Sequence, residues 1–204
     1  MTHLSNNTCS ENQVKTDSLF YEIFQTYPNL LFEFIGISPP KSANYCFLSQ
    51  EIKQTSFRID GVFVPPPADP ELPLYFVEFQ GYRDRHGDLY PGFFSEILTY
   101  LNDYRPTNDW CGILIFTQRS LEPGLPKQYD DFANSRYFQR FYLDEIVDEM
   151  AKGSPQLGII RLMGIAETVA PNAAKALIER SNRELPDAID QQKLFRISRS
   201  STCL

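Results

Sequence analysis

The sequence predicts an α/β fold in which a mixed central sheet is flanked by helices and followed by a helical C-terminal extension. Apolar residues recur at helical spacing near the start of the chain and again over residues 90–104. Strand-like apolar runs lie between and after these two segments, and the last third of the chain has mainly helical spacing. With 204 residues, of which 42% are hydrophobic, the chain can bury a sizeable core.

The first half of the chain contains one predicted helix and the main predicted strands. Apolar residues spaced by three and four from Leu19 to Tyr27 predict a helix that ends at Pro28. Residues 45–53 are expected to be extended. Residues 57–64 and 74–80 are predicted to be strands, separated by a loop crowded with prolines, which cannot donate backbone hydrogen bonds to a sheet.

The second half begins with a predicted helix over residues 90–104, in whose first turn Pro91 is acceptable. Residues 113–117 form a short apolar run that is typical of a buried strand. Residues 137–150 have a tyrosine-rich start, which we expect to be extended, followed by acidic residues at helical spacing. A further helical stretch is expected from residue 156 to about residue 182.

These elements divide the chain into four expected parts. Residues 1–15 are polar and are expected to form a disordered lead, and residues 16–152 form the main α/β domain. Residues 153–192 are expected to be a helical extension. Residues 193–204 are rich in Arg and Ser with little apolar spacing, so we expect a frayed tail.

Composition excludes several classes of function. The net charge is −7, from 19 Lys and Arg against 26 Asp and Glu, so the surface as a whole is not expected to attract nucleic acid. His3 and His86 are the only histidines, which excludes histidine-rich zinc sites, and no P-loop or dinucleotide-binding glycine motif occurs. The scattered cysteines and the lack of a long apolar segment indicate a cytoplasmic protein with no association with a membrane.

Two carboxylates interrupt otherwise apolar predicted strands. Asp60 lies within residues 57–64, and Glu78 lies within residues 74–80. Burial of a lone carboxylate is unfavourable or raises its pKa, so such a group normally has a partner or a metal ion. Because side chains alternate along a strand, Glu78 and Gln80 point to the same face, and Asp60 can join them if the two strands pair.

Such a pair of carboxylates is suited to a divalent cation. Mg²⁺ takes oxygen ligands, prefers one or two carboxylates and keeps water molecules for a substrate phosphate, and Mn²⁺ could substitute for it. The sequence therefore predicts metal-dependent hydrolysis of a phosphodiester bond, with Asp60 and Glu78 as the metal ligands.

Each of these residues also has a simpler interpretation. Asp60-Gly61 is a strong signal for a type I′ hairpin turn, although the flanking arms would be very short. Glu78 could be a charge on an edge strand that discourages aggregation. On spacing alone, the other candidates are ordinary helix, strand or loop positions, namely Glu22, Gln80, His86, Glu96 and Tyr100.

The order of these motifs resembles a superfamily of nucleases. A helix, an Asp in one strand, a Glu-x-Gln strand, a helix and a further strand are similar to the PD-(D/E)xK nucleases, which have a restriction-endonuclease-like fold. More closely, residues 57–63, 77–80 and 95–101 are similar to the bacterial family DUF2887, which is grouped with Rpn-type recombination-promoting nucleases and transposase-like proteins. The resemblance extends from about Thr16 to about Leu194.

The resemblance implies a magnesium-dependent DNA endonuclease over residues 16–152. Asp60 and Glu78 would bind the metal ion, and Gln80 would position the attacking water. The superfamily usually has Lys at the position of Gln80. Lysine offers a cation to the phosphate, whereas an amide offers only dipoles, so this departure weakens or abolishes the activity unless other residues compensate.

The resemblance also implies supporting residues. Glu96 and Tyr100 resemble a Gln-x-x-x-Tyr pattern on the helix after the catalytic strand of some relatives, and residues four apart share one face of a helix. Glu22 would be the additional acid that some relatives place on the first helix. Positive charge near the site could come from Arg58, Arg83, Arg85 or His86.

Two other functions remain open at this point. The chain could be a catalytically degenerate member of the nuclease fold that binds DNA or protein without cleavage, which the Gln80 departure and the net charge favour. It could also be an unrelated metal-dependent phosphohydrolase that acts on nucleotides. A double-strand break made with one active site per chain would favour a homodimer.

Overall fold

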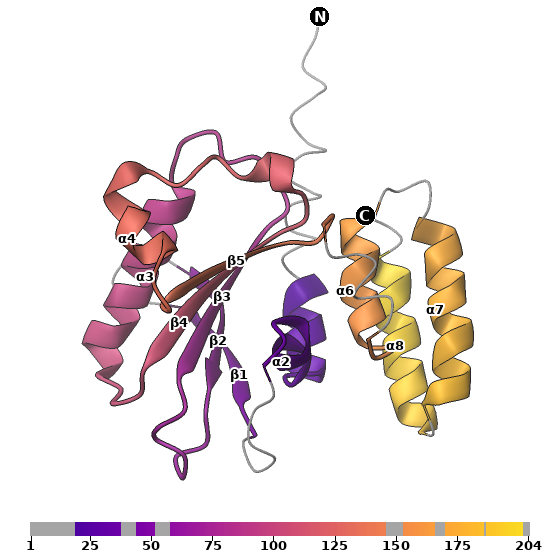
Figure 1. Cartoon of the computed structure of the whole chain (residues 1–204). Helices are drawn as coiled ribbons and strands as arrows, with labels where there is room; N and C mark the ends of the chain where they lie inside the picture. The colour runs from indigo at the N-terminus through magenta and orange to yellow at the C-terminus, as the bar shows by residue number, and fades with distance from the viewer. Residues whose placement is uncertain are drawn as a thin grey trace, which may run out of the picture. The chain divides into compact units, whose positions relative to one another are not determined.

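The described part of the chain forms two compact units. The computed structural model describes residues 19–37, 44–51, 58–145, 153–165, 170–185 and 187–201, except for the side chains of residues 49–51, 58–60, 133, 189 and 199–201. One unit comprises the described residues within 38–141 and carries the sheet (Figure 1). The other comprises those within 1–37 and 142–204 and is mainly helical.

The first unit is built on a five-stranded mixed sheet whose strands lie side by side in chain order. They are β1 (Cys46–Glu51), β2 (Arg58–Val64), β3 (Leu74–Gln80), β4 (Trp110–Phe116) and β5 (Phe138–Tyr142). The pairs β1–β2 and β2–β3 are antiparallel, whereas β4 is parallel to β3. Consequently β3 lies at the centre of the sheet, with a neighbour on each side.

The parallel pairing of β3 and β4 requires a crossover, which α3 (Leu89–Tyr104) provides. The buried residues of α3 recur at spacings of three and four, which gives the helix one apolar face. This face packs directly on β4, because a Cβ atom added to Gly112 would lie 2.9 Å from the ring of Phe93. Short elements follow β4, namely η1 (Arg119–Leu121), η2 (Lys127–Tyr129) and α4 (Asp130–Ala133).

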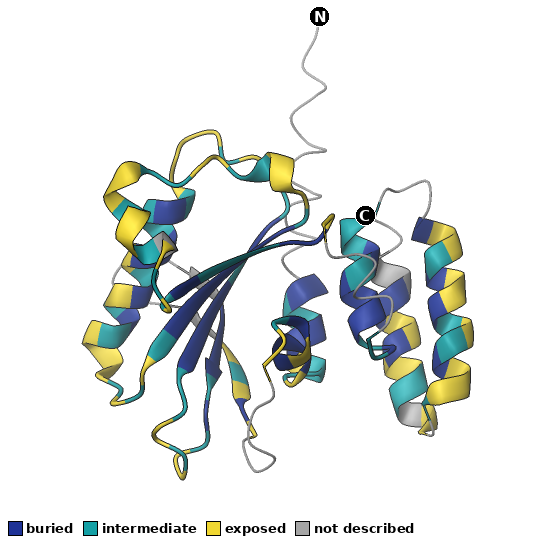
Figure 2. Cartoon of the chain, viewed as in Figure 1, coloured by how far each residue is buried: buried dark blue, intermediate teal, exposed yellow. Residues whose placement is uncertain are grey.

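The core of this unit lies in the central strands. β4 is buried from its second residue onward, and β3 is buried except at Glu78. Figure 2 shows these strands as the continuous dark blue part of the sheet. The strand predictions for residues 57–64 and 74–80 are confirmed over their described residues, and β4 begins three residues earlier than the expected run from Ile113.

A β-bulge interrupts the pairing of β1 with β2. The register of the two strands changes between Leu48 and Gln50, where one residue of β1 lies opposite Asp60 and Gly61 of β2. The ring of Phe47 covers Gly61 so closely that an added Cβ atom would overlap with it. The same ring packs on Phe63 at a centroid distance of 5.0 Å. A residue without a side chain is therefore required directly after Asp60.

The second unit consists of helices. Residues 19–26 are helical, as expected, and are followed by α2 (Leu30–Phe34). After the sheet come α6 (Leu157–Gly164), α7 (Ala170–Glu184) and α8 (Ala188–Ser201), which pack against one another. The α/β class, with a mixed sheet and a helical C-terminal part, is therefore confirmed, and so is the order of helix, three strands, helix and strand.

Two expectations for the C-terminal part are wrong. The helical stretch from residue 156 is not continuous, because α6 ends at Gly164 and α7 begins at Ala170. Residues 193–204 were expected to be frayed, but α8 extends to Ser201. Leu194 and Ile197 are fully buried, so these sparse apolar positions are enough to dock a helix whose other residues are mainly Arg, Ser and Gln.

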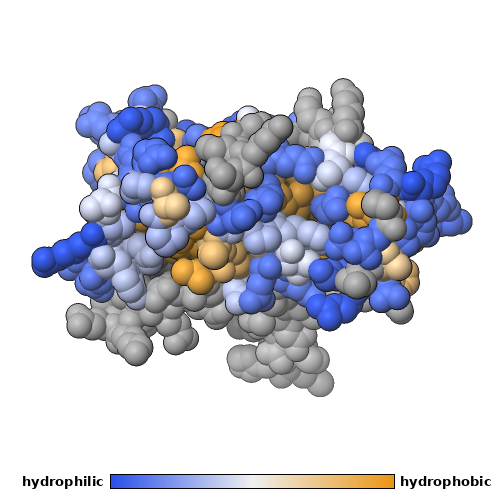
Figure 3. Space-filling view, turned by 90° about the horizontal axis from the view of Figure 1, so that it is seen from below, coloured by the Kyte–Doolittle hydropathy of each residue, from blue (hydrophilic) through white to orange (hydrophobic). Residues whose placement is uncertain are grey.

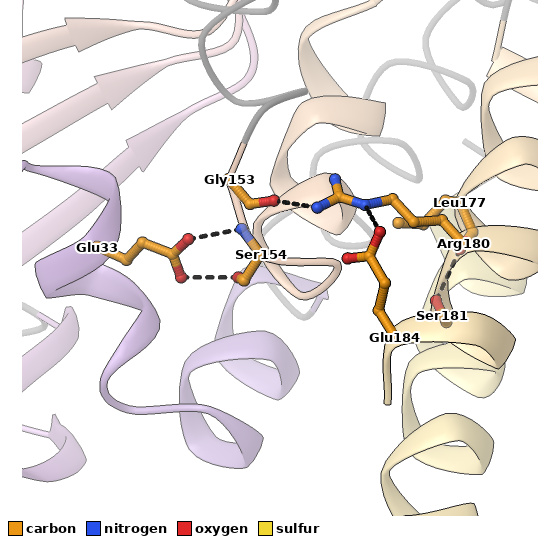
Figure 4. Close-up of polar contacts among 7 residues, drawn as sticks. All are labelled: Glu33, Gly153, Ser154, Leu177, Arg180, Ser181 and Glu184. Carbon is orange, nitrogen blue, oxygen red and sulfur yellow. Dashed lines mark hydrogen bonds and ion pairs between the residues drawn. The ribbon is translucent and has the colours of Figure 1, made fainter. Parts of the chain in front are cut away.

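Polar contacts join α2, α6 and α7 within the helical unit (Figure 4). Glu33 of α2 accepts hydrogen bonds from the backbone N–H and the hydroxyl of Ser154, both at 2.7 Å. The Ser154 hydroxyl oxygen also accepts the N–H of Leu157, the first residue of α6. Arg180 of α7 donates to the carbonyl of Gly153 at 2.6 Å and pairs with Glu184 at 2.9 Å. The segment that leads into α6 is thus held from both sides.

No helix in the described ranges is long and apolar enough to cross a membrane. The face of the molecule drawn in Figure 3 is mainly hydrophilic, with hydrophobic residues visible in limited areas.

The contact of Gly61 with Phe47 predicts that Gly61→Ala destabilises the sheet unit by about 1–3 kcal/mol, the usual cost of overpacking. Gly92→Ala is the matched control, because nothing lies within 4 Å of a Cβ atom in that helical position. This control should be neutral or should stabilise by about 0.5–1 kcal/mol. Urea unfolding of both variants measures the difference, and equal midpoints would contradict the packing argument.

The contacts of Ser154 predict that Ser154→Ala lowers the free energy of unfolding by about 1 kcal/mol, because α6 loses the acceptor for its first N–H. Ser95→Ala, at an exposed position of α3, serves as the control. Thermal unfolding followed by circular dichroism should show a lower midpoint only for Ser154→Ala, and a Ser154→Ala protein as stable as the parent would rule out the cap.

Candidate functional site

A cavity of about 290 Å³ lies beside the C-terminal half of β3 and the first half of α3. The lining residues of β3 and of the loop after it are every second residue from 78 to 88. The lining residues are Glu78, Gln80, Tyr82, Asp84, His86, Asp88, Leu89, Gly92, Phe93 and Glu96. The cavity is therefore framed by one strand, one loop and one helix, all within the sheet unit.

Glu78 is the residue of β3 that reaches this cavity from the middle of the apolar strand. The strand's other residues are buried, Glu78 is partly exposed, and its Oε2 atom is buried. Gln80 lies on the same face, as the alternation predicts. The interpretation of Glu78 as an edge-strand charge is wrong, because β3 has β2 on one side and β4 on the other.

Asp60 lies in β2, next to β3. Asp60-Gly61 is not a hairpin turn, because both residues are inside the continuous strand Arg58–Val64. Gly61 pairs with Val77 of β3. Asp60 precedes Gly61 and Glu78 follows Val77, so in these antiparallel strands both residues lie one position beyond the same pair. The side chains of Asp60 and of Arg58 lie outside the described part.

The loop after β3 is shaped by Asp84. Its Oδ1 atom accepts the N–H groups of His86 and Gly87 at 3.0 and 2.9 Å, and its Oδ2 atom accepts the N–H of Leu89 at 3.0 Å. Partial burial raises the pKa of Asp84, but hydrogen bonds from the backbone outweigh this effect and lower that pKa below its usual value. Asp84 thus fixes both the path of the loop and the first turn of α3.

The side chain of Gln80 is buried and hydrogen-bonded within the protein, which the sequence did not predict. It is 2% exposed, and its side-chain amide donates a hydrogen bond of 2.6 Å to the carbonyl of Tyr82. The amide therefore connects the end of β3 to the following loop. Gln80 also lines the cavity, and its predicted role in positioning a water molecule remains a prediction.

The side chains of Glu96 and Tyr100 have different surroundings, although both residues lie on the same face of α3. Glu96 lines the cavity, whereas Tyr100 is 7% exposed and packs edge-on against Phe76 at 5.2 Å. Burial and the neighbouring Tyr104 raise the pKa of Tyr100. Tyr100 does not line the cavity and is an ordinary buried helix position, which spacing alone allowed, and its implied supporting role stays a prediction.

Glu22 belongs to the helical unit and does not line the cavity. It pairs with Arg196 of α8 at 2.6 Å, which is a sufficient structural reason for its position. Its proposed role as an additional acid stays a prediction.

A polar network behind the cavity wall holds the start of α3. Tyr90, which is 1% exposed, donates a hydrogen bond of 2.7 Å to Glu122, and Arg140 of β5 pairs with the same carboxylate oxygen at 2.5 Å. Burial, followed by the hydrogen bond to Glu122, raises the pKa of Tyr90. The first turn of α3, which carries Gly92 and Phe93 to the cavity, is therefore anchored on its other side.

Sequence reasoning did not identify Tyr82, Asp84 and Asp88 as parts of this site. The signal was present in the period of two that continues past β3, since these residues follow Glu78 and Gln80 at every second position. This period is difficult to recognise in the sequence, because the residues that alternate with the lining residues are arginines and glycines instead of apolar residues.

The model of the family described as "Protein of unknown function (DUF2887)" matches residues 16–200. The chain belongs to the DUF2887 family. The match extends beyond the expected limit near Leu194 and includes most of α8. No curated protein matches the chain, and no solved structure matches it.

Two of the residues that line this DUF2887 cavity carry the type of donor atom that a hard divalent cation prefers. Glu78 and Glu96 bring carboxylates from facing elements, and oxygen donors of this kind are those that Mg²⁺ and Mn²⁺ prefer. Among the described side chains, no three His, Cys, Asp or Glu groups lie close enough together to hold a metal ion. The predicted ligand Asp60 is outside that search.

The pKa of Asp84 predicts how its contribution to stability depends on pH. Because the folded-state pKa is lowered, this contribution is present above the unfolded-state pKa of about 3.9 and is lost as pH falls through the folded-state pKa. Asp84→Ala should cost about 1 kcal/mol at pH 7, as removal of a helix cap does, and less at pH 3. Asp103→Ala, an exposed carboxylate on α3, is the control. A cost for Asp84→Ala that is the same in urea unfolding at both pH values would contradict this account.

Proposed function

We propose that the chain is a metal-dependent DNA endonuclease that hydrolyses phosphodiester bonds in the β3–α3 cavity. The observation that carries the proposal is the position of Glu78, a carboxylate in the middle of the central strand, which faces a cavity instead of a hydrophobic core. A carboxylate in such a position costs stability unless a partner or a metal ion stabilises it, and carboxylates that face a cavity are available to a metal ion.

The arrangement of the strands supports a two-carboxylate site. Asp60 and Glu78 come from adjacent antiparallel strands and lie at corresponding positions, one residue beyond the pair Gly61–Val77. The β-bulge at Asp60 is a second argument, because bulges recur next to active sites and redirect side chains. The order of the elements agrees with the proposed relation to the PD-(D/E)xK nucleases and their restriction-endonuclease-like fold.

In this proposal Asp60 and Glu78 would hold Mg²⁺ or Mn²⁺, with Glu96 on the opposite wall. A bound divalent cation supplies a water molecule of lowered pKa and neutralises charge on the scissile phosphate. Gln80 keeps the loop against the end of β3 through its bond to Tyr82, and Asp84 keeps His86 at the cavity. Arginines of the loop would add positive charge near the site, although they do not line the cavity as the lysine of the superfamily would.

The wider context of the reaction follows from the resemblance to recombination-promoting nucleases. We propose that the substrate is cytoplasmic DNA and that cleavage serves the recombination of mobile elements. A homodimer would provide one active site for each strand of the duplex.

One observation favours a second function, in which the chain binds DNA or protein without cleaving it. Gln80 is 2% exposed and its amide is engaged by the carbonyl of Tyr82, so it presents no cation to a phosphate. In a degenerate nuclease the cavity would retain its shape but not its catalytic charge.

A plasmid assay distinguishes the two proposed functions. The purified protein should nick supercoiled DNA in the presence of Mg²⁺ or Mn²⁺ and not with a chelator, and Glu78→Gln or Asp60→Asn should reduce the rate by at least about 100-fold, since each removes charge that acts on the transition state. Glu71→Gln, at an exposed position of the same unit, should leave the rate unchanged.

Binding of the plasmid without nicking under every metal condition would support the second function. Nicking that survives in both Glu78→Gln and Asp60→Asn would exclude the β3–α3 cavity as the active site.

A further inference from the structure

A second cavity, of about 280 Å³, is formed by two helices of the helical unit. The helices α7 and α8 pack against each other, and each contributes one face to the cavity (Figure 1). The lining residues are Ile178, Ser181 and Asn182 of α7 and Gln191, Gln192, Leu194 and Phe195 of α8. We call this cavity the α7–α8 groove. Asn182, Gln192 and Phe195 are exposed, so the groove opens on the surface of the unit.

The more buried lining residues present little polarity to the α7–α8 groove. Leu194 is fully buried, and Ser181 is 2% exposed. The hydroxyl of Ser181 donates a hydrogen bond of 2.7 Å to the carbonyl of Leu177 (Figure 4). The side-chain amide of Gln191 donates to the carbonyl of Leu185, also at 2.7 Å. Because these donors are used within the unit, the inner part of the groove is suited to an apolar group.

A large apolar side chain lies at the edge of the same groove. Phe195 is 44% exposed, more than Ile37, the other large hydrophobic residue that is exposed in the described part of the helical unit. Burial of an aromatic ring removes a large apolar area from water, and aromatic residues are enriched where proteins contact one another. One surface therefore carries both an apolar cavity and a ring of the kind that fills such a cavity.

The α7–α8 groove is uncharged at its centre and bordered by charged residues. None of the described residues that line it is charged. Charged residues next to the lining residues form ion pairs within the protein, namely Arg180 with Glu184 at 2.9 Å, Lys193 with Asp190 at 3.7 Å and Arg196 with Glu22 at 2.6 Å. An uncharged centre inside a charged border is the usual arrangement of an interface between proteins.

This distribution of charge favours a second copy of the chain as the partner. The groove offers no charged group that would select a partner of opposite charge. In a contact with two-fold symmetry, residues near the axis meet their own copies, so a charged residue there would meet a like charge. An amide has both a donor and an acceptor and can bond to its own copy. Asn182 and Gln192 are the exposed polar residues of the groove, and both are amides.

We propose that the α7–α8 groove joins two copies of the chain in a symmetric homodimer, with Phe195 of each copy in the groove of the other. The ring and the cavity lie on the same surface, as a two-fold contact requires. The inference goes beyond the proposed function, because it holds whether or not the chain cleaves DNA. It also gives the helical unit a role of its own, since a dimer carries two β3–α3 cavities.

Sedimentation equilibrium of the full chain, over a range of protein concentrations, measures the dissociation constant of the dimer. Phe195→Ser should raise this constant at least about 30-fold, as truncation of a central aromatic residue does at protein interfaces. Leu98→Ser is the matched control, because Leu98 is 54% exposed on α3 of the sheet unit. This control should keep the parental dissociation constant.

Two charge variants test the symmetry of the contact without changing Phe195. Gln192→Glu and Gln192→Lys should each dimerise more weakly than the parent, because like charges then face each other across the axis. An equimolar mixture of the two should recover the dimer, because opposite charges then meet. Recovery in the mixture also shows that both variants are folded.

A parent that stays monomeric at every concentration would overturn the proposal and leave the α7–α8 groove to a different partner or to none. A dimer that Phe195→Ser does not weaken, or that Leu98→Ser weakens as much, would also overturn it. So would a mixture of the charge variants that dimerises no better than either variant alone. These results do not depend on cleavage, so failure of the nuclease proposal would leave the dimer contact intact.

Discussion

The position of one carboxylate constrains the rest of the sheet unit. Glu78 occupies the middle of a central strand whose other residues are buried, and hydrophobic burial is the main favourable term in folding. Keeping a charge there requires an opening in the core, which the β3–α3 cavity provides. The walls of this opening cannot collapse, because the N-terminal turn of α3 is held by Asp84 on one side and by the Tyr90–Glu122–Arg140 network on the other.

The neighbouring strand β2 is also irregular beside the cavity. A bulge at Asp60 and Gly61 changes the register with β1, and the ring of Phe47 takes the space that a side chain at residue 61 would need. The sheet therefore departs from regular pairing beside the position of Glu78. Local irregularity in an otherwise regular, buried sheet is typical of sites that serve binding or catalysis more than stability.

Elements with a strong apolar period were predictable from the sequence. The strand from Leu74 to Gln80 and the α3 helix follow from alternation and from three-and-four spacing, and both lie where expected. Long-range pairing was not predictable, so a turn at Asp60-Gly61 and an edge position for Glu78 stayed open as alternatives until the strand order was known. The helix α8 was missed because it depends on packing partners that local spacing does not reveal.

The central claim is that Glu78 is retained in the sheet to bind a divalent cation. Titration of the metal-free protein with Mn²⁺, followed by electron paramagnetic resonance of the unbound ion, tests this claim without reference to any substrate. The account predicts that the parent binds Mn²⁺ and that a folded Glu78→Leu protein loses this binding, because the variant removes a carboxylate ligand. A folded Glu78→Leu protein with unchanged Mn²⁺ affinity would contradict the account.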